Sequence, residues 1–323
     1  MSGSSPTAAD AREDVEAGKP ASRPKPFLPD WPGFGPHFRA MSFDITIFWL
    51  LALASLVLYL KPPGLARPLL FVLYQDGLPD RLDIAVPYAD EILDTYASAG
   101  IATGVPMFVI LVVELGWIRS FRSLEAATGG FQMALVCTSF VTTVLKVTVG
   151  GLRPHFLAVC NPDHAMPGIG YANLYYTPII CNGSNAHDIL EAQMSFPSGH
   201  ASSAFAGAVY LCLWLNAVLK IFSGCRTSYW KLLVFFVPLL GAILLGLSKV
   251  ADSYHHMSDV ITGAAIGIFF ALLAYRGAHA SIWDWRYNHM PLSRTVPFDY
   301  EAPYVEVSDL RDFRARSPVE NGG

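Results

Sequence analysis

The stretch LSKVADSYHHMSDV, residues 247–260, places two adjacent histidines and several charged side chains between two long apolar runs. The runs cover residues 231–248 and 259–276. Each is close to the ~20 residues that a helix needs to cross the ~30 Å hydrocarbon core of a bilayer. Such runs must be helical in lipid, because no water is present to satisfy the backbone polar groups. We therefore predict that the stretch is a short polar connection between two membrane spans.

Further apolar runs of similar length precede this pair, at roughly residues 43–60, 101–118, 130–149 and 201–222. The composition agrees with membrane burial, because 53% of the residues are hydrophobic and only 15% are charged, with a mean hydropathy of +0.38. An average soluble domain has roughly 25% charged residues. We predict an all-α, polytopic membrane protein with six transmembrane helices. The net charge of −4 gives no indication of nucleic-acid binding.

The six runs divide the chain into a central membrane domain and two polar tails. The predicted parts are a disordered N-terminal tail (1–42), a six-helix domain (43–276) and a C-terminal tail (277–323). Both tails are rich in proline and mixed in charge, which is typical of disordered segments. Residues 1–40 contain no apolar signal-peptide core, so the first run is expected to act as an uncleaved anchor.

The distribution of Lys and Arg predicts the orientation of the spans. Sixteen basic residues lie on the side of the tails and six on the other side. Basic residues concentrate in the cytoplasm, so both tails are predicted to be cytoplasmic. The segments 61–100, 150–200 and 249–258 then face the lumen or the cell exterior. The residues do not distinguish the endoplasmic reticulum, Golgi or vacuole from the plasma membrane, and they leave a homo-oligomer open.

The 150–200 segment carries two features that suit an oxidising, non-cytoplasmic compartment. Asn182 begins the only Asn-X-Ser/Thr glycosylation acceptor of the chain, and we predict that it is glycosylated. Cys160 and Cys181 share the same segment, where a disulfide can form if the segment is lumenal.

Two polar clusters lie at the ends of the third and fourth runs that this orientation places on the same membrane face. In KVTVGGLRPHF (146–156), Lys146 and Arg153 are about two helical turns apart and can face one way. In FPSGHASSAF (196–205), Ser198 and Gly199 suit the start of a helix, whose free N–H groups attract an anion. His200 would point into the same space. Taken singly, each cluster is also typical of an ordinary helix end.

The third cluster is the stretch around the histidine pair, and it reaches the same face. Asp259 is four residues after His255 and three after His256, so helical spacing alone does not decide which imidazole it orients. A shared metal is disfavoured, because adjacent residues on a helix point about 100° apart. Lys249 adds a third cation.

The three clusters together combine fixed cations, a helix N-terminus and two histidines. Cations and N–H donors favour an anionic group such as phosphate. Two histidines without a metal cluster favour a nucleophile and a general acid. An anion channel is disfavoured, because the polar clusters gather at one face and charge is scarce in the middle of the spans, with Glu114, near the cytoplasmic end of its span, as the exception. The acidic residues of the 61–100 segment are interpreted as a solvated loop; they are Asp80, Asp83, Asp90, Glu91 and Asp94.

The pattern resembles the membrane branch of the type-2 phosphatidic acid phosphatases, also called lipid phosphate phosphatases. That family's motifs are K-x6-R-P, P-S-G-H and S-R-x5-H-x3-D. This chain has Lys146-x6-Arg153-Pro154, Pro197-Ser198-Gly199-His200 and Ser248-Lys249-x5-His255-x3-Asp259. The resemblance covers about residues 100–276 and differs at Lys249, where the family has arginine.

The resemblance implies an enzyme that removes phosphate from lipids at the lumenal or extracellular ends of helices 3–6, without a metal or other cofactor. It implies that His255 attacks phosphorus, that Asp259 orients His255, and that His200 protonates the leaving group. The implied phosphate ligands are Lys146, Arg153, Ser198, Gly199 and Lys249. Expected substrates are phosphatidate, lysophosphatidate, diacylglycerol pyrophosphate or sphingoid phosphates. A phosphotransferase with an alcohol acceptor is the alternative. A lysine at 249 predicts weaker phosphate binding than the family arginine, with the chemistry retained.

Overall fold

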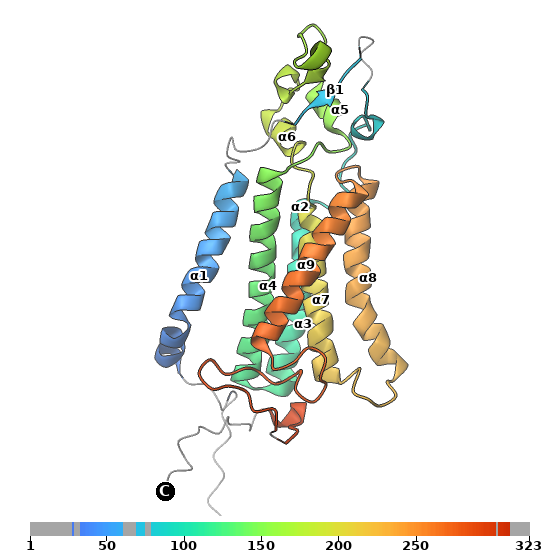
Figure 1. Cartoon of the computed structure of the whole chain (residues 1–323). Coiled ribbons are helices and arrows are strands. Elements are labelled where there is room, and N and C mark those ends of the chain that lie inside the picture. Colours follow the sequence, from blue (N-terminus) through green and yellow to red (C-terminus); the bar gives the residue numbers. More distant parts are fainter. Residues whose placement is uncertain (1–27, 29–32, 61–68, 75–78, 302, 311–323) are drawn as a thin grey trace, which may run out of the picture.

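The computed structural model describes residues 28, 33–60, 69–74, 79–301 and 303–310, which form a bundle of long helices with a loop-rich cap at one end (Figure 1). Six helical stretches are long and apolar enough to cross a membrane by length and composition. They are α1 (Phe34–Leu60), the composite span Thr95–Ile118, α4 (Phe121–Thr148), α7 (Gly199–Leu219), α8 (Tyr229–Ala251) and α9 (Met257–Ala278). The predicted all-α fold with six spans is confirmed.

The composite second span contains two π-helical turns. It consists of α2 (Thr95–Ala99), a π-helical turn at Gly100–Gly104, α3 (Val105–Val113) and a second π-helical turn at Glu114–Ile118. Asp94 caps its start by accepting the N–H of Ala97 at 2.6 Å. The carboxylate therefore fixes where the chain enters this span.

All six spans begin before their apolar runs, and the difference is largest, at nine residues, for α1 and α4. Helix α1 begins at Phe34 rather than near residue 43. Helix α4 begins at Phe121, so most of the 119–129 gap between the second and third apolar runs is helical, and the connection is limited to Arg119 and Ser120. The side chain of Ser120 accepts the N–H of Ser123 at 3.4 Å and caps α4. A hydropathy window misses such turns, because a helix can continue beyond the apolar part of its sequence.

Helix α7 is the centre of the bundle. Of its most apolar 18-residue window, 72% is buried, against 6% for α1, which lies beside α4 at the edge (Figure 1). Helix α9 crosses α7 closely. A Cβ atom added to Gly263 would lie 2.4 Å from the carbonyl oxygen of Ser198, and one added to Gly267 would lie 2.3 Å from that of Ser202. The two backbones approach this closely only because glycine has no side chain.

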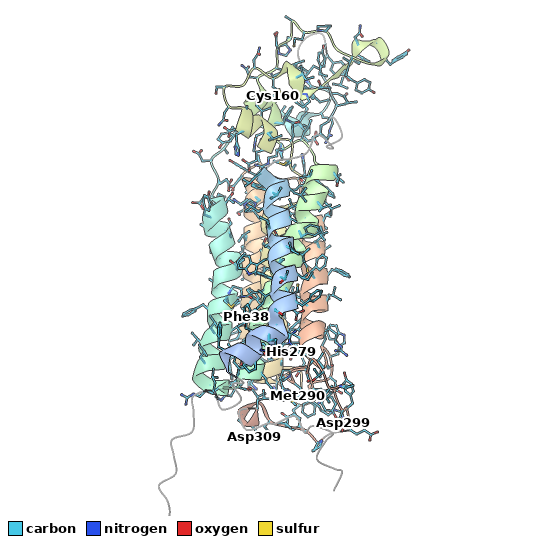
Figure 2. The ribbon with its side chains drawn as sticks, turned by 90° about the vertical axis from the view of Figure 1, so that its left-hand side faces the viewer. Phe38, Cys160, His279, Met290, Asp299 and Asp309 are labelled. Atoms are coloured by element: carbon cyan, nitrogen blue, oxygen red, sulfur yellow. A yellow bond between two sulfur atoms is a disulfide. The ribbon has the colours of Figure 1, made fainter. Side chains whose placement is uncertain are left out.

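The loop-rich cap follows α4 and also includes the chain before α2. Strand β1 (Phe71–Val72) pairs antiparallel with β2 (Tyr175–Tyr176), and the short helices are α5 (Phe156–Cys160) and α6 (Ala186–Glu191). Short 3-10 turns cover Leu82–Ile84, Tyr171–Asn173 and Pro178–Ile180. Cys160 and Cys181 form a disulfide in this cap (Figure 2). The pairing that the sequence left conditional is therefore present.

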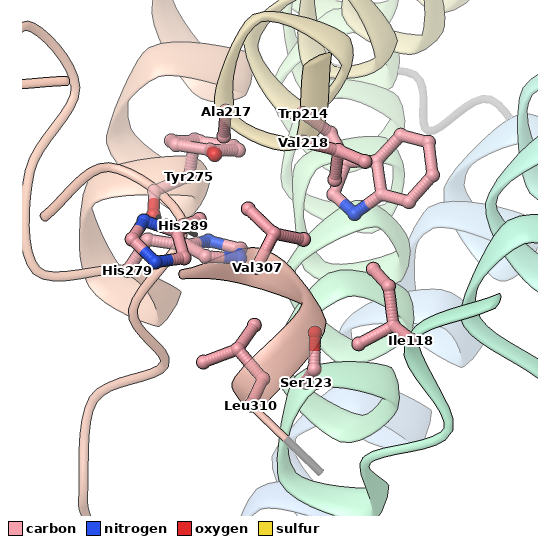
Figure 3. A pocket seen from close by; sticks show the side chains of 10 residues that line it. All are labelled: Ile118, Ser123, Trp214, Ala217, Val218, Tyr275, His279, His289, Val307 and Leu310. Atoms are coloured by element: carbon pink, nitrogen blue, oxygen red, sulfur yellow. Dashed lines mark hydrogen bonds between the residues drawn. The ribbon is translucent and has the colours of Figure 1, made fainter. Parts of the chain in front are cut away.

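The chain after α9 packs against the opposite end of the bundle (Figure 2). Val307 and Leu310, in and beside the 3-10 turn Val307–Asp309, are buried in one apolar cluster with Ile118 and Trp214 (Figure 3). Residues 279–301 and 303–310 are thus ordered, unlike the disordered tail that composition predicted. The remaining parts of the predicted tails, 1–27, 29–32, 302 and 311–323, lie outside the described residues.

A partly buried ammonium group holds part of this C-terminal segment in place. Lys220, at the end of α7, donates from Nζ to the carbonyl oxygen of Trp285 at 2.6 Å and to Asn288 Oδ1 at 2.9 Å. It also lies 2.7 Å from His289 Nδ1. Three acceptors match the three N–H bonds of an ammonium group. Lys220 therefore joins the C-terminal segment to the central helix.

Candidate active site

The three polar clusters of the sequence meet where α4 ends, α7 begins and α9 begins. Backbone hydrogen bonds connect the segments directly. Gly151 donates to Gln193 at 2.9 Å, and Arg153 donates to Ala192 at 2.8 Å, which ties the chain after α4 to the chain before α7. Ser198 donates its N–H to the carbonyl oxygen of Asp259 at 3.0 Å, which ties the start of α7 to α9. The predicted convergence of these clusters is therefore a feature of the fold.

His255 is buried beside the carboxylate of Asp259. Its Nδ1 lies 3.8 Å from Asp259 Oδ2, and the imidazole is 1% exposed. Oδ2 also accepts the hydroxyl of Ser195 at 2.6 Å and the backbone N–H of His256 at 3.0 Å. These two donors fix the carboxylate on the Nδ1 side of the ring, although Nδ1 itself is buried with no hydrogen-bond partner among the described residues. Ser195 could not be predicted from local sequence, because a single serine before the second motif matches no pattern.

His256, the neighbour that helical spacing could not separate from His255, has a different position. It is the residue before the first turn of α9, and its Nε2 lies 3.1 Å from the carbonyl oxygen of Leu152. Because both its backbone and its ring bind protein groups, His256 connects α9 to the chain after α4. The geometry therefore favours His255 as the reactive imidazole.

His200, in the first turn of α7, faces the ring of His255. The two ring centroids are 6.0 Å apart in an edge-on arrangement. His200 Nε2 is buried and has no hydrogen-bond partner within the described part of the chain. Buried polar atoms are nearly always paired in proteins, so an unpaired ring nitrogen beside a second histidine is typical of a reactive site.

Burial also sets the charge state of His255. It lowers the pKa of His255 to about 3, and the positive charges of Lys146 and Arg153 add to the shift, while the carboxylate of Asp259 opposes it. An imidazole with this pKa is neutral near pH 7, so its free nitrogen keeps the lone pair that a nucleophile needs.

Lys146 approaches the start of α7 from the last turn of α4. Its Nζ donates to the carbonyl oxygen of Met194 at 2.6 Å. A Cβ atom added to Gly199 would lie 3.7 Å from Lys146 Cε, so the side chain passes beside the helix N-terminus. The ammonium group and the helix dipole therefore act on the same space. Ser198 caps α7, because its hydroxyl accepts the N–H of Ala201 at 3.3 Å.

Arg153 brings a second cation to the same region. Its Nη2 donates to Glu191 Oε1 at 3.0 Å, and its guanidinium carbon lies 5.0 Å from the ring centroid of Tyr254. Its Nε is buried with no hydrogen-bond partner among the described residues. Tyr254 lies in the chain after α8, within the third motif. A residue of the third motif therefore packs against Arg153 of the first motif.

Lys249 lies in the last turn of α8, at the end nearest the candidate site, and its side chain is fully buried. Its Nζ donates to Glu91 Oε2 at 2.5 Å and to the carbonyl oxygen of Leu93, and it lies 3.7 Å from Asp252 Oδ2. The interpretation of the acidic segment as a solvated loop is therefore wrong for Glu91. Local sequence could not predict the contact between Glu91 and Lys249, because the two residues are separated by 158 positions.

Comparison with known proteins places this sequence in a family. Residues 128–283 match the model of the PAP2 superfamily. A PA-phosphatase related-family protein of Dictyostelium discoideum is 31% identical over 255 residues, which cover 77% of this chain and 73% of that protein. Diacylglycerol pyrophosphate phosphatase 1 of Saccharomyces cerevisiae is 38% identical, over 56% of this chain and 62% of the relative. Phospholipid phosphatase 1 of Mus musculus is 37% identical, over 58% and 71%.

No solved structure matches the chain. The family model spans all three polar clusters, and the Dictyostelium relative extends the similarity over most of the six-helix domain. The chain therefore belongs to the PAP2 superfamily.

Proposed function

We propose that this protein is a metal-independent lipid phosphate phosphatase that acts through a phosphohistidine intermediate. The observation that carries the proposal is the facing pair of histidines, with ring centroids 6.0 Å apart and the His200 Nε2 atom buried without a partner among the described residues, beside a helix N-terminus and two cations. The relatives named as phospholipid and diacylglycerol pyrophosphate phosphatases support the same substrate class.

The proposed first step forms a bond between His255 and phosphorus. Because Nδ1 faces Asp259, Nδ1 keeps the proton and Nε2 provides the electron pair. The bond between phosphorus and the lipid oxygen breaks, and that oxygen takes a proton from the protonated imidazole of His200. Asp259 stabilises the positive charge that develops on His255.

The proposed second step returns the enzyme to its starting state. His200, now neutral, removes a proton from water, and the resulting oxygen attacks phosphorus. The bond to His255 Nε2 breaks, and inorganic phosphate leaves. If an alcohol attacks in place of water, the same intermediate yields a phosphotransferase, which we keep as the alternative.

The proposed phosphate site uses fixed positive charge. Lys146 and Arg153 lie on one side, and the N-terminus of α7 offers the hydroxyl of Ser198 and the N–H of Gly199. Such preorganised groups stabilise the charge of the transition state in a buried site. Lys249 belongs to this set through its charge, although its donors bind Glu91 and Leu93.

The experiment that tests this function is phosphate release from a panel of lipid phosphates in detergent micelles containing EDTA. The panel contains phosphatidate, lysophosphatidate, diacylglycerol pyrophosphate and a sphingoid phosphate. We expect release from at least one of them at a rate that EDTA does not change. Release from none of them, or loss of release in EDTA, would contradict a metal-independent lipid phosphatase. Adding a water-soluble alcohol and measuring its phosphorylated product separates hydrolysis from phosphotransfer.

We further propose that the site faces the lumen or the cell exterior, with both tails in the cytoplasm. The support is the excess of basic residues on the tail side, the Cys160–Cys181 disulfide and the exposed Asn182 in the same cap. In eukaryotic cells, glycosidase treatment is expected to increase the mobility of the protein, and Asn182→Gln is expected to remove the shift. If glycosidase treatment does not change the mobility of the protein, Asn182 no longer supports this orientation.

A further inference from the structure

Residues 79–94, here called the bridging segment, connect the chain after α4 to the chain after α8. The N–H of Val86 donates to the carbonyl oxygen of Pro154 at 2.9 Å. The hydroxyl of Tyr88 lies 3.0 Å from that of Tyr254, and its ring centroid lies 5.3 Å from that of His155. The bridging segment thus contacts the residues that directly follow Arg153 and directly precede His255.

The bridging segment is attached to α8 by a buried charge network. Lys249 donates to Glu91 Oε2 at 2.5 Å and to the carbonyl oxygen of Leu93. Asp252 Oδ2 lies 3.7 Å from the same ammonium group and accepts the N–H of Ile92 at 3.0 Å. Two carboxylates and one carbonyl oxygen therefore surround a side chain that is 0% exposed.

The physical consequence is that burial of Lys249 depends on Glu91. A buried ammonium group that loses its closest partner is destabilised, because water cannot reach it and Asp252, at 3.7 Å, does not replace the lost hydrogen bond. An ammonium group has three donors on a compact charge, and the three acceptors around Lys249 match that number. Arginine instead presents five donors in a planar fork. The lysine that replaces the family arginine is thus suited to this attachment.

The attachment also affects the phosphate site. Tyr88 contacts Tyr254, and the ring of Tyr254 supports the guanidinium group of Arg153 at 5.0 Å. Releasing the bridging segment would remove a neighbour of Tyr254 and free the chain that carries Arg153. A change at Glu91 would therefore reach the phosphate site through two aromatic rings, without Glu91 touching the phosphate.

We propose that Glu91 and Lys249 form an anchor that fixes the bridging segment across the site, and that Glu91 is a positioning residue for the phosphate-binding Arg153. Lys249 then acts as part of the anchor rather than as a direct phosphate ligand. The structural part of the proposal stands on the contacts alone, and its effect on turnover rests on the proposed phosphatase function.

The experiment compares Glu91→Gln and Lys249→Arg with the wild type, and uses Asp83→Asn as the matched control. Asp83 is a carboxylate of the same segment, half exposed and paired with Arg81. Hydrogen–deuterium exchange of the full chain in micelles is followed at the amides of Val86 and Ile92. We expect exchange at least about tenfold faster in both anchor variants, because the partner of a buried charge is weakened or lost. We expect no change in Asp83→Asn, and unchanged exchange in α4 and α7 shows that each variant is folded.

The kinetic readout separates positioning from a general loss of structure. We expect Glu91→Gln to lower kcat/KM about tenfold, chiefly through KM, because the change acts on phosphate binding. Partial unfolding would instead lower kcat and leave KM unchanged. Lys249→Arg is expected to lower kcat/KM, whereas a direct phosphate ligand would predict that arginine raises or preserves it.

Unchanged exchange in Glu91→Gln would overturn the anchor, and so would a Lys249→Arg variant that equals or exceeds the wild type in kcat/KM. A wild-type protein without activity on any lipid phosphate would contradict the proposed phosphatase function. The exchange measurement would still decide whether the anchor exists, so the two failures can be distinguished.

Discussion

Replacing His255 with alanine is expected to lower phosphate release from lipid phosphates by on the order of 10³-fold or more, because the attacking nitrogen is removed. His256→Ala is the matched control, since it removes the neighbouring imidazole and leaves the proposed nucleophile. It should change kcat/KM by no more than about tenfold, which corresponds to the loss of one hydrogen bond to Leu152 and some order at the start of α9.

The measurement is kcat/KM for the two variants and the wild type in the same micelles, with the melting temperature of each. Rapid acid-free quenching with radiolabelled lipid phosphate should trap labelled protein in the wild type and not in His255→Ala. Equal losses from both variants at equal melting temperatures would contradict the assignment to His255.

The pH dependence of the reaction gives this assignment a second readout. Burial lowers the pKa of His255 to about 3, so the imidazole is neutral across roughly pH 5 to 8 and gains its proton only in stronger acid. The nucleophile is therefore available throughout this range. A fall in kcat/KM on the acid side of this range would have to come from another group.

Replacing His200 with alanine is expected to lower release from phosphatidate by about 10²- to 10⁴-fold, the usual contribution of a general acid–base residue. The effect should depend on the leaving group. An alkoxide needs a proton to depart, whereas p-nitrophenolate departs without one. The two steps assigned to His200 can therefore be separated with these two substrates.

With p-nitrophenyl phosphate, His200→Ala should release a burst of p-nitrophenolate equal to the amount of enzyme and then turn over slowly, because water is no longer activated. With phosphatidate, the first step itself should be slow and no burst should appear. His187→Ala is a suitable control, because His187 is an exposed histidine on α6. The acid role would be contradicted if His200→Ala showed no burst and its rate fell by the same factor on both substrates.

Much of the fold and of the candidate site followed from local sequence. Each span was visible because a membrane helix needs about 20 apolar residues in sequence, and no distant partner changes that requirement. Lys146, Arg153, His200 and His255 stood out because they are polar groups at the ends of such spans. The helix ends themselves were less predictable, since the first turns of α1 and α4 lie outside the apolar windows.

The choice between His255 and His256 shows where local sequence reaches its limit. Their spacing to Asp259 allowed both, and only the motif resemblance separated them. The structure separates them by contact, because the ring of His256 binds the carbonyl oxygen of Leu152 while His255 faces His200. Such a difference depends on how α4, α7 and α9 cross, which Gly263 and Gly267 permit.

The sequence by itself determined the membrane class of this protein, the order of its six spans and the residues that gather at one end of them. These properties are local, because they depend on hydrophobicity and on residues a few positions apart. The tertiary structure alone decided that Ser195 holds Asp259 and that Glu91 binds Lys249. It also decided that residues 279–301 and 303–310 pack against the end of the bundle opposite the cap. Each of these contacts joins distant residues, and burial makes them strong enough to fix a charge or a ring in one position.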